Sequence, residues 1–184
     1  YIKSKKQLHL KKMSDPKILF QNNYIQVIEN KGRVGIKQKN PSVMILPYTI
    51  DENGNPKSIG LISEPSDIKE ERMTKTVITG SPEKSDVDIL ATAKRELTEE
   101  SGYVVDDTEK WDFLGNIQSS KLVVNGNPAF GVDVTGLERE DKLGDGSESE
   151  KNSKFSLVSL NDALNIDDAL ISCLFLKIFQ NKLI

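Results

Sequence analysis

Three glutamates within five residues, Glu96, Glu99 and Glu100, are the side chains of this sequence best suited to chemistry. Residues three and four apart lie on one face of a helix, so these carboxylates would project together. Like charges at that spacing repel one another and weaken an isolated helix. Because Mg²⁺ and Mn²⁺ prefer oxygen ligands, we interpret the cluster as a site for a divalent cation. The alternative is a solvated acidic helix face, which is what most glutamate-rich stretches are.

The residues around the cluster predict a helix from about residue 87 to residue 101. Ser85 or Asp86 is expected to cap its start, and Asp88 to lie in the first turn, where a carboxylate complements the helix dipole. Gly102 can take the left-handed conformation that ends a helix. The residues at helical spacing that would face the core are Leu90, Ala93 and Leu97.

A longer pattern resembles the Nudix box, the signature of hydrolases that split a nucleoside diphosphate linked to another group. It consists of Gly80, Asp86 and the run Arg95-Glu96-Leu97-Thr98-Glu99-Glu100-Ser101-Gly102-Tyr103. The family pattern is glycine, five residues, glutamate, seven residues, and then Arg-Glu-apolar-x-Glu-Glu-x-Gly-apolar. The C-terminal half matches at every specified position. The N-terminal half departs twice, because Asp86 replaces glutamate and one additional residue precedes Arg95.

The resemblance implies roles for individual residues of the box. Glu96 and Glu100 would be the main ligands of Mg²⁺ or Mn²⁺, and the backbone carbonyl of Thr79 would be a further ligand. Glu99 would be a weaker ligand or a catalytic group, because Arg95 lies four residues before it and can hold its side chain. Structural support of the site would come from Gly80, Arg95 and Gly102.

Further site residues are expected outside the box. The resemblance implies an acidic base or ligand in the loop before the last strand, where Glu148 and Glu150 are candidates; a solvated acidic loop is the alternative. An aromatic clamp for a base would be Tyr24, Tyr48 or Phe130, each of which would otherwise pack in the core or the N-terminal hairpin.

The substrate class is less sharply indicated. The N-terminal hairpin followed by Val43-Met44-Ile45-Leu46-Pro47-Tyr48, and the long lead before the box, resemble the enzymes that hydrolyse ADP-ribose or other nucleoside diphosphate sugars. That subgroup usually has Glu-x-Pro-Ala-Gly before the box, where this chain has Thr76-Val77-Ile78-Thr79-Gly80. Dinucleoside polyphosphates and NADH- or FAD-type dinucleotides stay open as substrates. A non-catalytic nucleotide sensor and a protein-interaction domain with an acidic helix stay open as functions.

The pattern of apolar runs and turns predicts a mixed α/β domain. Strands are expected near residues 18–20, 24–28, 33–36, 42–49, 58–63, 75–79, 111–119, 129–135 and 155–160, and helices near 161–165 and 167–181. The resemblance implies an α/β/α sandwich around a mixed β-sheet with a loop-helix-loop catalytic motif. We expect one Nudix domain over residues 15–184, preceded by a flexible basic tail over residues 1–14.

Composition excludes several other classes of site. The single histidine, His9, lies in a lysine-rich arm, and the single cysteine, Cys173, lies in an apolar run, so we expect neither a histidine-dependent triad nor a Cys/His zinc site. The net charge of −3 gives no general attraction to nucleic acid, and no apolar run is long enough to span a membrane. A lone cysteine cannot form an internal disulfide, so we expect a cytoplasmic protein, and the resemblance implies a small nucleotide as its partner. N-terminal strand exchange in related enzymes and the apolar terminal helix also fit a homodimer.

Overall fold

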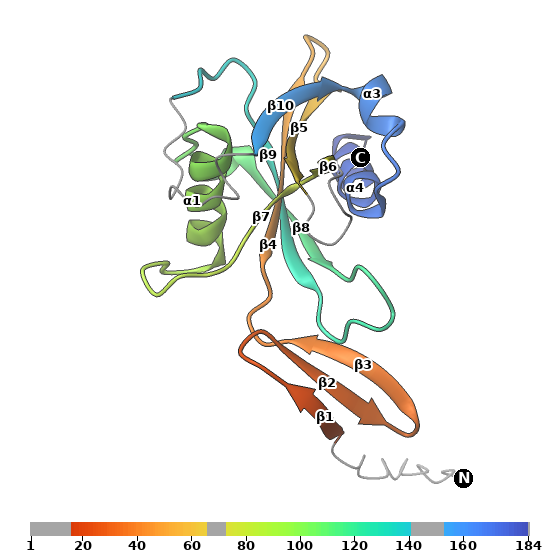
Figure 1. Cartoon of the computed structure of the whole chain (residues 1–184). Helices are drawn as coiled ribbons and strands as arrows, with labels where there is room; N and C mark the ends of the chain where they lie inside the picture. The colour runs from red at the N-terminus through yellow and green to blue at the C-terminus, as the bar shows by residue number, and fades with distance from the viewer. Residues whose placement is uncertain (1–15, 66–72, 141–152, 184) are drawn as a thin grey trace, which may run out of the picture.

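The computed structural model describes residues 16–65, 73–140 and 153–183, with side chains up to residue 180. The described residues form two sheets and a few helices (Figure 1). The expected N-terminal tail, His9, Glu148 and Glu150 lie outside the described residues.

The first sheet is an antiparallel meander of β1 (Lys17–Gln21), β2 (Ile25–Asn30) and β3 (Arg33–Gln38). β2 and β3 are joined by Lys31 and Gly32, whose φ angles of 51° and 76° suit the tight two-residue turn of a hairpin. The outer edge of β3 is covered by a later segment of the chain. Ile36 donates its N–H to the Leu122 carbonyl at 2.7 Å, and Val124 donates to the Ile36 carbonyl at 2.8 Å. This small sheet lies at one end of the molecule, apart from the helices (Figure 1).

The second sheet has seven strands in the order β10-β5-β4-β9-β8, with β6 paired to β5 and β7 paired to β4. The pairing of β4 with β9 is parallel and the other pairings are antiparallel, so the sheet is mixed as expected. The strands are β4 (Val43–Ile50), β5 (Pro56–Pro65), β6 (Met73–Thr76), β7 (Ile78–Gly80), β8 (Trp111–Ile117), β9 (Asn127–Asp133) and β10 (Lys154–Ser159).

Helices cover both faces of the seven-stranded sheet (Figure 1). One face is covered by α1 (Ile89–Ser101), and the other by α3 (Leu160–Leu164) and α4 (Ala169–Leu183). A short 3₁₀ helix, η1 (Thr108–Lys110), precedes β8. β4 is buried on both faces and is therefore apolar without interruption. Val43 and Ile45 pack on the α1 side, whereas Met44, Leu46 and Tyr48 pack on the α4 side. The predicted α/β/α sandwich is confirmed.

The segment that leads into the box differs from its prediction. A single strand over residues 75–79 was expected, but the chain forms two short strands on either side of Val77. β6 pairs with β5 and β7 pairs with β4, so the chain crosses from one neighbour to the other at this residue. Val77 is 1% exposed and packs on the α4 side, which anchors the crossing. Because of this crossing, Gly80 lies on the α1 side of the sheet.

Candidate functional site

The loop between β7 and α1 is organised by the carboxylate of Asp86. One oxygen, Oδ2, accepts hydrogen bonds from the Glu83 N–H at 2.8 Å and from the Thr92 hydroxyl at 3.0 Å. Arg95 binds both oxygens, through Nη2 at 3.2 Å and Nε at 3.3 Å. The Asp86 side chain is 7% exposed. The hydrogen bond from Arg95 is the main cause that holds the pKa of Asp86 below its usual value, and the Glu83 N–H adds to it.

The expected N-cap of the helix was wrong. α1 begins at Ile89, and Asp88 is its cap: the Asp88 carboxylate accepts the Ala91 N–H at 2.8 Å. Asp86 does not cap the helix because its carboxylate binds Arg95 and Thr92, one turn further along α1. The additional residue of the box lies between Asp86 and Arg95.

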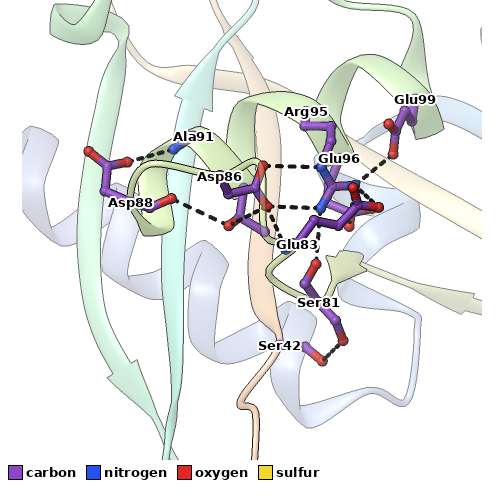
Figure 2. A network of polar contacts seen from close by, with 10 residues as sticks. Ser42, Ser81, Glu83, Asp86, Asp88, Ala91, Arg95, Glu96 and Glu99 are labelled. Atoms are coloured by element: carbon purple, nitrogen blue, oxygen red, sulfur yellow. Dashed lines mark hydrogen bonds and ion pairs between the residues drawn. The ribbon is translucent and has the colours of Figure 1, made fainter.

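Arg95 is the centre of the polar network (Figure 2). Besides binding Asp86, its Nη1 atom lies 2.9 Å from Glu96 Oε1 and 2.9 Å from Glu99 Oε2. Its Nη2 atom donates to the Ser81 carbonyl at 2.9 Å. Burial lowers the pKa of Arg95, but Asp86 and the two glutamates raise it more, so the guanidinium stays charged. The predicted contact between Arg95 and Glu99 is confirmed, and the same arginine also holds Glu96.

Gly80 and Glu96 meet where β7 approaches α1. A Cβ atom on residue 80 would overlap the side chain of Glu96, so only glycine leaves room for this carboxylate. The Glu96 side chain is 12% exposed. It is therefore seated directly against the end of β7, whose last two residues are Thr79 and Gly80. This contact explains why the pattern requires glycine at the start of the box.

The acidic face of α1 concentrates three carboxylates along one helix. Burial raises the pKa of Glu96 to about 7, the charges of Glu99 and Glu100 add to the rise, and contact with Arg95 opposes it. Such a cluster is electrostatically suited to a cation with oxygen ligands. Within the described residues, however, no three acidic, histidine or cysteine side chains are arranged as a ready-made metal site.

The C-terminal end of α1 is closed by Gly102. Its φ of 76° is left-handed, and its N–H donates to the Thr98 carbonyl at 2.9 Å. The carbonyl of Gly102 accepts the Glu140 N–H at 2.8 Å, and Arg139 Nε donates to the Ser101 carbonyl at 2.7 Å. The glycine therefore ends the helix as predicted and also joins it to the segment after β9.

The three aromatic residues proposed as a base clamp do not lie together. Tyr24 is 78% exposed and follows β1 in the N-terminal sheet. Tyr48 is 1% exposed on the α4 side, and its hydroxyl donates to Asp112 Oδ2 at 3.0 Å. Phe130 is 5% exposed and packs edge-on against Trp111, with ring centroids 6.1 Å apart. Tyr48 and Phe130 thus pack in the core, which was the alternative interpretation.

Solved structures share this arrangement of sheet and helices. An ADP compounds hydrolase matches with a TM-score of 0.57 and 17% identity, over 91% of this chain and 94% of that one. The NUDIX domain of Shewanella oneidensis NrtR, complexed with ADP ribose, matches with a TM-score of 0.53 and 13% identity, over 77% of this chain and 85% of that one. This protein has the Nudix fold. No family model matches the chain, and no curated protein matches it.

The structure adds partners that the sequence pattern did not single out. Thr92 is completely buried and donates to Asp86, and Ser81 offers its carbonyl to Arg95. Arg139 lies over the rings of Phe155 and Tyr103, 4.9 Å and 5.9 Å from their centroids. Only one feature of the sequence could have pointed to Thr92: it is a polar residue among the core-facing positions of an amphipathic helix.

Proposed function

We propose that this protein is a metal-dependent pyrophosphohydrolase that acts on a nucleoside diphosphate linked to another group. The observation that carries the proposal is the position of Glu96. Its carboxylate is seated against Gly80 and held by Arg95, while Glu99 and Glu100 follow on the same helix. Like charges at this spacing would otherwise only destabilise the helix, and a bound cation would offset their repulsion.

The donor set fits Mg²⁺ or Mn²⁺. Glu96, Glu99, Glu100 and the Thr79 carbonyl offer only oxygen atoms, which these hard cations prefer over nitrogen and sulfur. We assign Glu96 and Glu100 as the main ligands. Glu99 is kept as the weaker ligand because the box pattern favours Glu96 and Glu100; Arg95 Nη1 lies 2.9 Å from both Glu96 and Glu99, so this contact does not rank the two. When bound, the cation would supply positive charge against the pyrophosphate oxygens and make water more acidic.

The residues of the chain have separate tasks in the proposed reaction. Water attacks one phosphorus atom, and the bridging oxygen leaves with the other phosphate, which yields a nucleoside monophosphate and a phosphorylated product. Glu100 or Glu99 would take the proton from the water, and Arg95 keeps the neighbouring carboxylates in place. Glu148 and Glu150, which lie outside the described residues, stay candidates for the same task.

ADP-ribose or a nucleoside diphosphate sugar is the substrate that we propose first. Support comes from the two structural neighbours, one an ADP compounds hydrolase and the other a domain complexed with ADP ribose. Dinucleoside polyphosphates and NADH- or FAD-type dinucleotides are the next classes to test. Their shared feature is the pyrophosphate group that the box would bind.

Product analysis with a substrate panel tests the proposal. The protein is incubated with Mg²⁺ or Mn²⁺ and with ADP-ribose, UDP-glucose, NADH or diadenosine polyphosphates. We expect a nucleoside monophosphate and a phosphorylated product from at least one compound, and complete loss of turnover with chelator or in Glu100→Gln. Glu52→Gln, in an exposed turn between β4 and β5, is the matched control and should keep full activity. Wild-type turnover in Glu100→Gln would refute the metal assignment.

A nucleotide sensor without turnover is the second candidate function. Among the described residues, no three acidic side chains are arranged as a ready-made metal site, which favours a sensor. The ion pairs of Arg95 with Glu96 and Glu99 favour it as well. A sensor would bind ADP-ribose, as measured by calorimetry, without releasing any product from the panel. A homodimer and a cytoplasmic location also stay proposals, which sedimentation velocity and localisation of the tagged protein would test.

A further inference from the structure

The N-terminal sheet carries a cavity of about 630 Å³ that shares no lining residue with the box. Three of its lining residues are cationic: Lys31 and Arg33 belong to the β2–β3 hairpin, and Lys121 to the segment that covers the edge of β3. Its aliphatic lining residues, which include Ile28, Leu122 and Val124, are called its aliphatic floor below. A cavity of this size is within the range of small-molecule sites, roughly 300–1,000 Å³.

The charge of the cavity is one-sided. None of its described lining residues is acidic, although the whole chain has a net charge of −3. Among residues 16–65, 73–140 and 153–183, no carboxylate forms an ion pair with Lys31, Arg33 or Lys121. The nearby Glu29 accepts the Gly32 N–H at 2.8 Å instead. Three such cations around one apolar floor favour an anion as the occupant.

The backbone at Lys31 adds an independent observation. Its φ of 51° makes it the only residue other than glycine with a positive φ among the described residues. Asparagine and glycine are the residues that tolerate this conformation in a tight hairpin turn, and lysine is disfavoured there. Unfavourable backbone conformations are often retained where the side chain has a task. Here the task would be to present an ammonium group to the cavity that Lys31 lines.

We propose that this cavity binds a small organic phosphate, in which the phosphate meets the three cations and an apolar or flat group lies on the aliphatic floor. A single-stranded nucleic acid is a weaker fit, because such strands usually stack on aromatic side chains and the described lining has none. The site is separate from the box and does not depend on the proposed hydrolysis.

Nuclear magnetic resonance of the full chain tests the proposal, with AMP as the probe and a chelator present to keep metal out of the box. We expect the amide signals of Gly32, Gly35 and Val124 to shift and saturate. Inorganic phosphate should shift the same signals with weaker affinity, because it cannot use the aliphatic floor. If the three amides do not shift with AMP, or if phosphate binds as tightly as AMP, the proposed organic phosphate is wrong.

Two variants and a matched control separate binding from folding. Lys31→Asn should weaken AMP binding by about fivefold, while the melting temperature rises by about 2 °C because asparagine tolerates the left-handed conformation. Lys121→Gln should weaken binding by about the same factor. Lys37→Gln changes an exposed lysine of β3 outside the lining and should leave binding unchanged. Equal binding in all four proteins, or binding of an oligouridine much tighter than AMP with the same shifts, would refute the proposal.

Discussion

Replacing Asp86 by alanine should lower the free energy of unfolding by about 3 kcal/mol. The side chain is 7% exposed and accepts hydrogen bonds from the Glu83 N–H, the Thr92 hydroxyl and Arg95. Removing one partner of a buried ion pair typically costs about 3–5 kcal/mol. The lower end applies here, because Arg95 keeps its contacts with Ser81 and the glutamates, and Thr92 keeps a contact with the Asp88 carbonyl at 3.4 Å.

Urea unfolding, followed by the fluorescence of the single tryptophan, measures this loss. Trp111 is 8% exposed in the core on the α1 side, so its emission reports on the packing that α1 completes. Asp88→Ala is the matched control, because it removes only the helix cap and should cost about 1 kcal/mol. If Asp86→Ala is destabilised by less than Asp88→Ala, then Asp86 does not organise the loop as described.

The stability difference between wild type and Asp86→Ala should also depend on pH. The pKa of Asp86 is lower in the folded protein than its usual value of 3.8, so its contribution to stability is complete above that value. The contribution is lost as the pH falls through the folded pKa, because both states are then protonated. We expect the difference in unfolding free energy between wild type and Asp86→Ala to shrink as the pH falls below about 4. A difference that grows on acidification would contradict the assigned ion pair.

Two glycines of the box give further predictions. Gly80→Ala should displace the flexible side chain of Glu96. Turnover should fall about 100-fold with only a small loss of stability. An unchanged kcat would exclude the proposed role of this contact. Gly102→Asn should destabilise the protein by more than about 2 kcal/mol in a melting experiment, because any Cβ meets the Glu140 carbonyl. Gly54 has a φ of 80° and open space around it, so Gly54→Asn should leave the melting temperature nearly unchanged. Equal losses of stability in Gly54→Asn and Gly102→Asn would refute the close approach of Gly102 to the Glu140 carbonyl.

Much of the fold followed from local patterns in the sequence. The turn over residues 51–55 is a local feature: it forms because the Asp51 carboxylate accepts the N–H groups of Asn53 and Asn55, both at 2.9 Å. The left-handed end of α1 at Gly102 was expected for a similar local reason. The apolar run of β4 predicted a buried strand, and both of its faces are buried. Each of these features depends on residues close in sequence.

Other features depend on contacts between distant segments and were missed. The strand before the box divides at Val77 because β5 and β4 each pair with one half of it. The separate N-terminal sheet is held by residues 122–125, far from it in sequence. Ser85 or Asp86 was expected to cap the helix, but Arg95 binds the carboxylate of Asp86, and Asp88 is the cap. Short-range propensities do not contain these contacts.

The sequence by itself determined the residue types, their spacing and the helix that presents Glu96, Glu99 and Glu100 on one face, because helical periodicity is a local property. It therefore determined which carboxylates are available for chemistry. Only the tertiary structure decided that Gly80 lies against Glu96 and that Arg95 forms ion pairs with four acidic side chains at once. Those contacts exist because the mixed sheet brings the end of β7 against α1, and the packing of a strand on a helix is a long-range event.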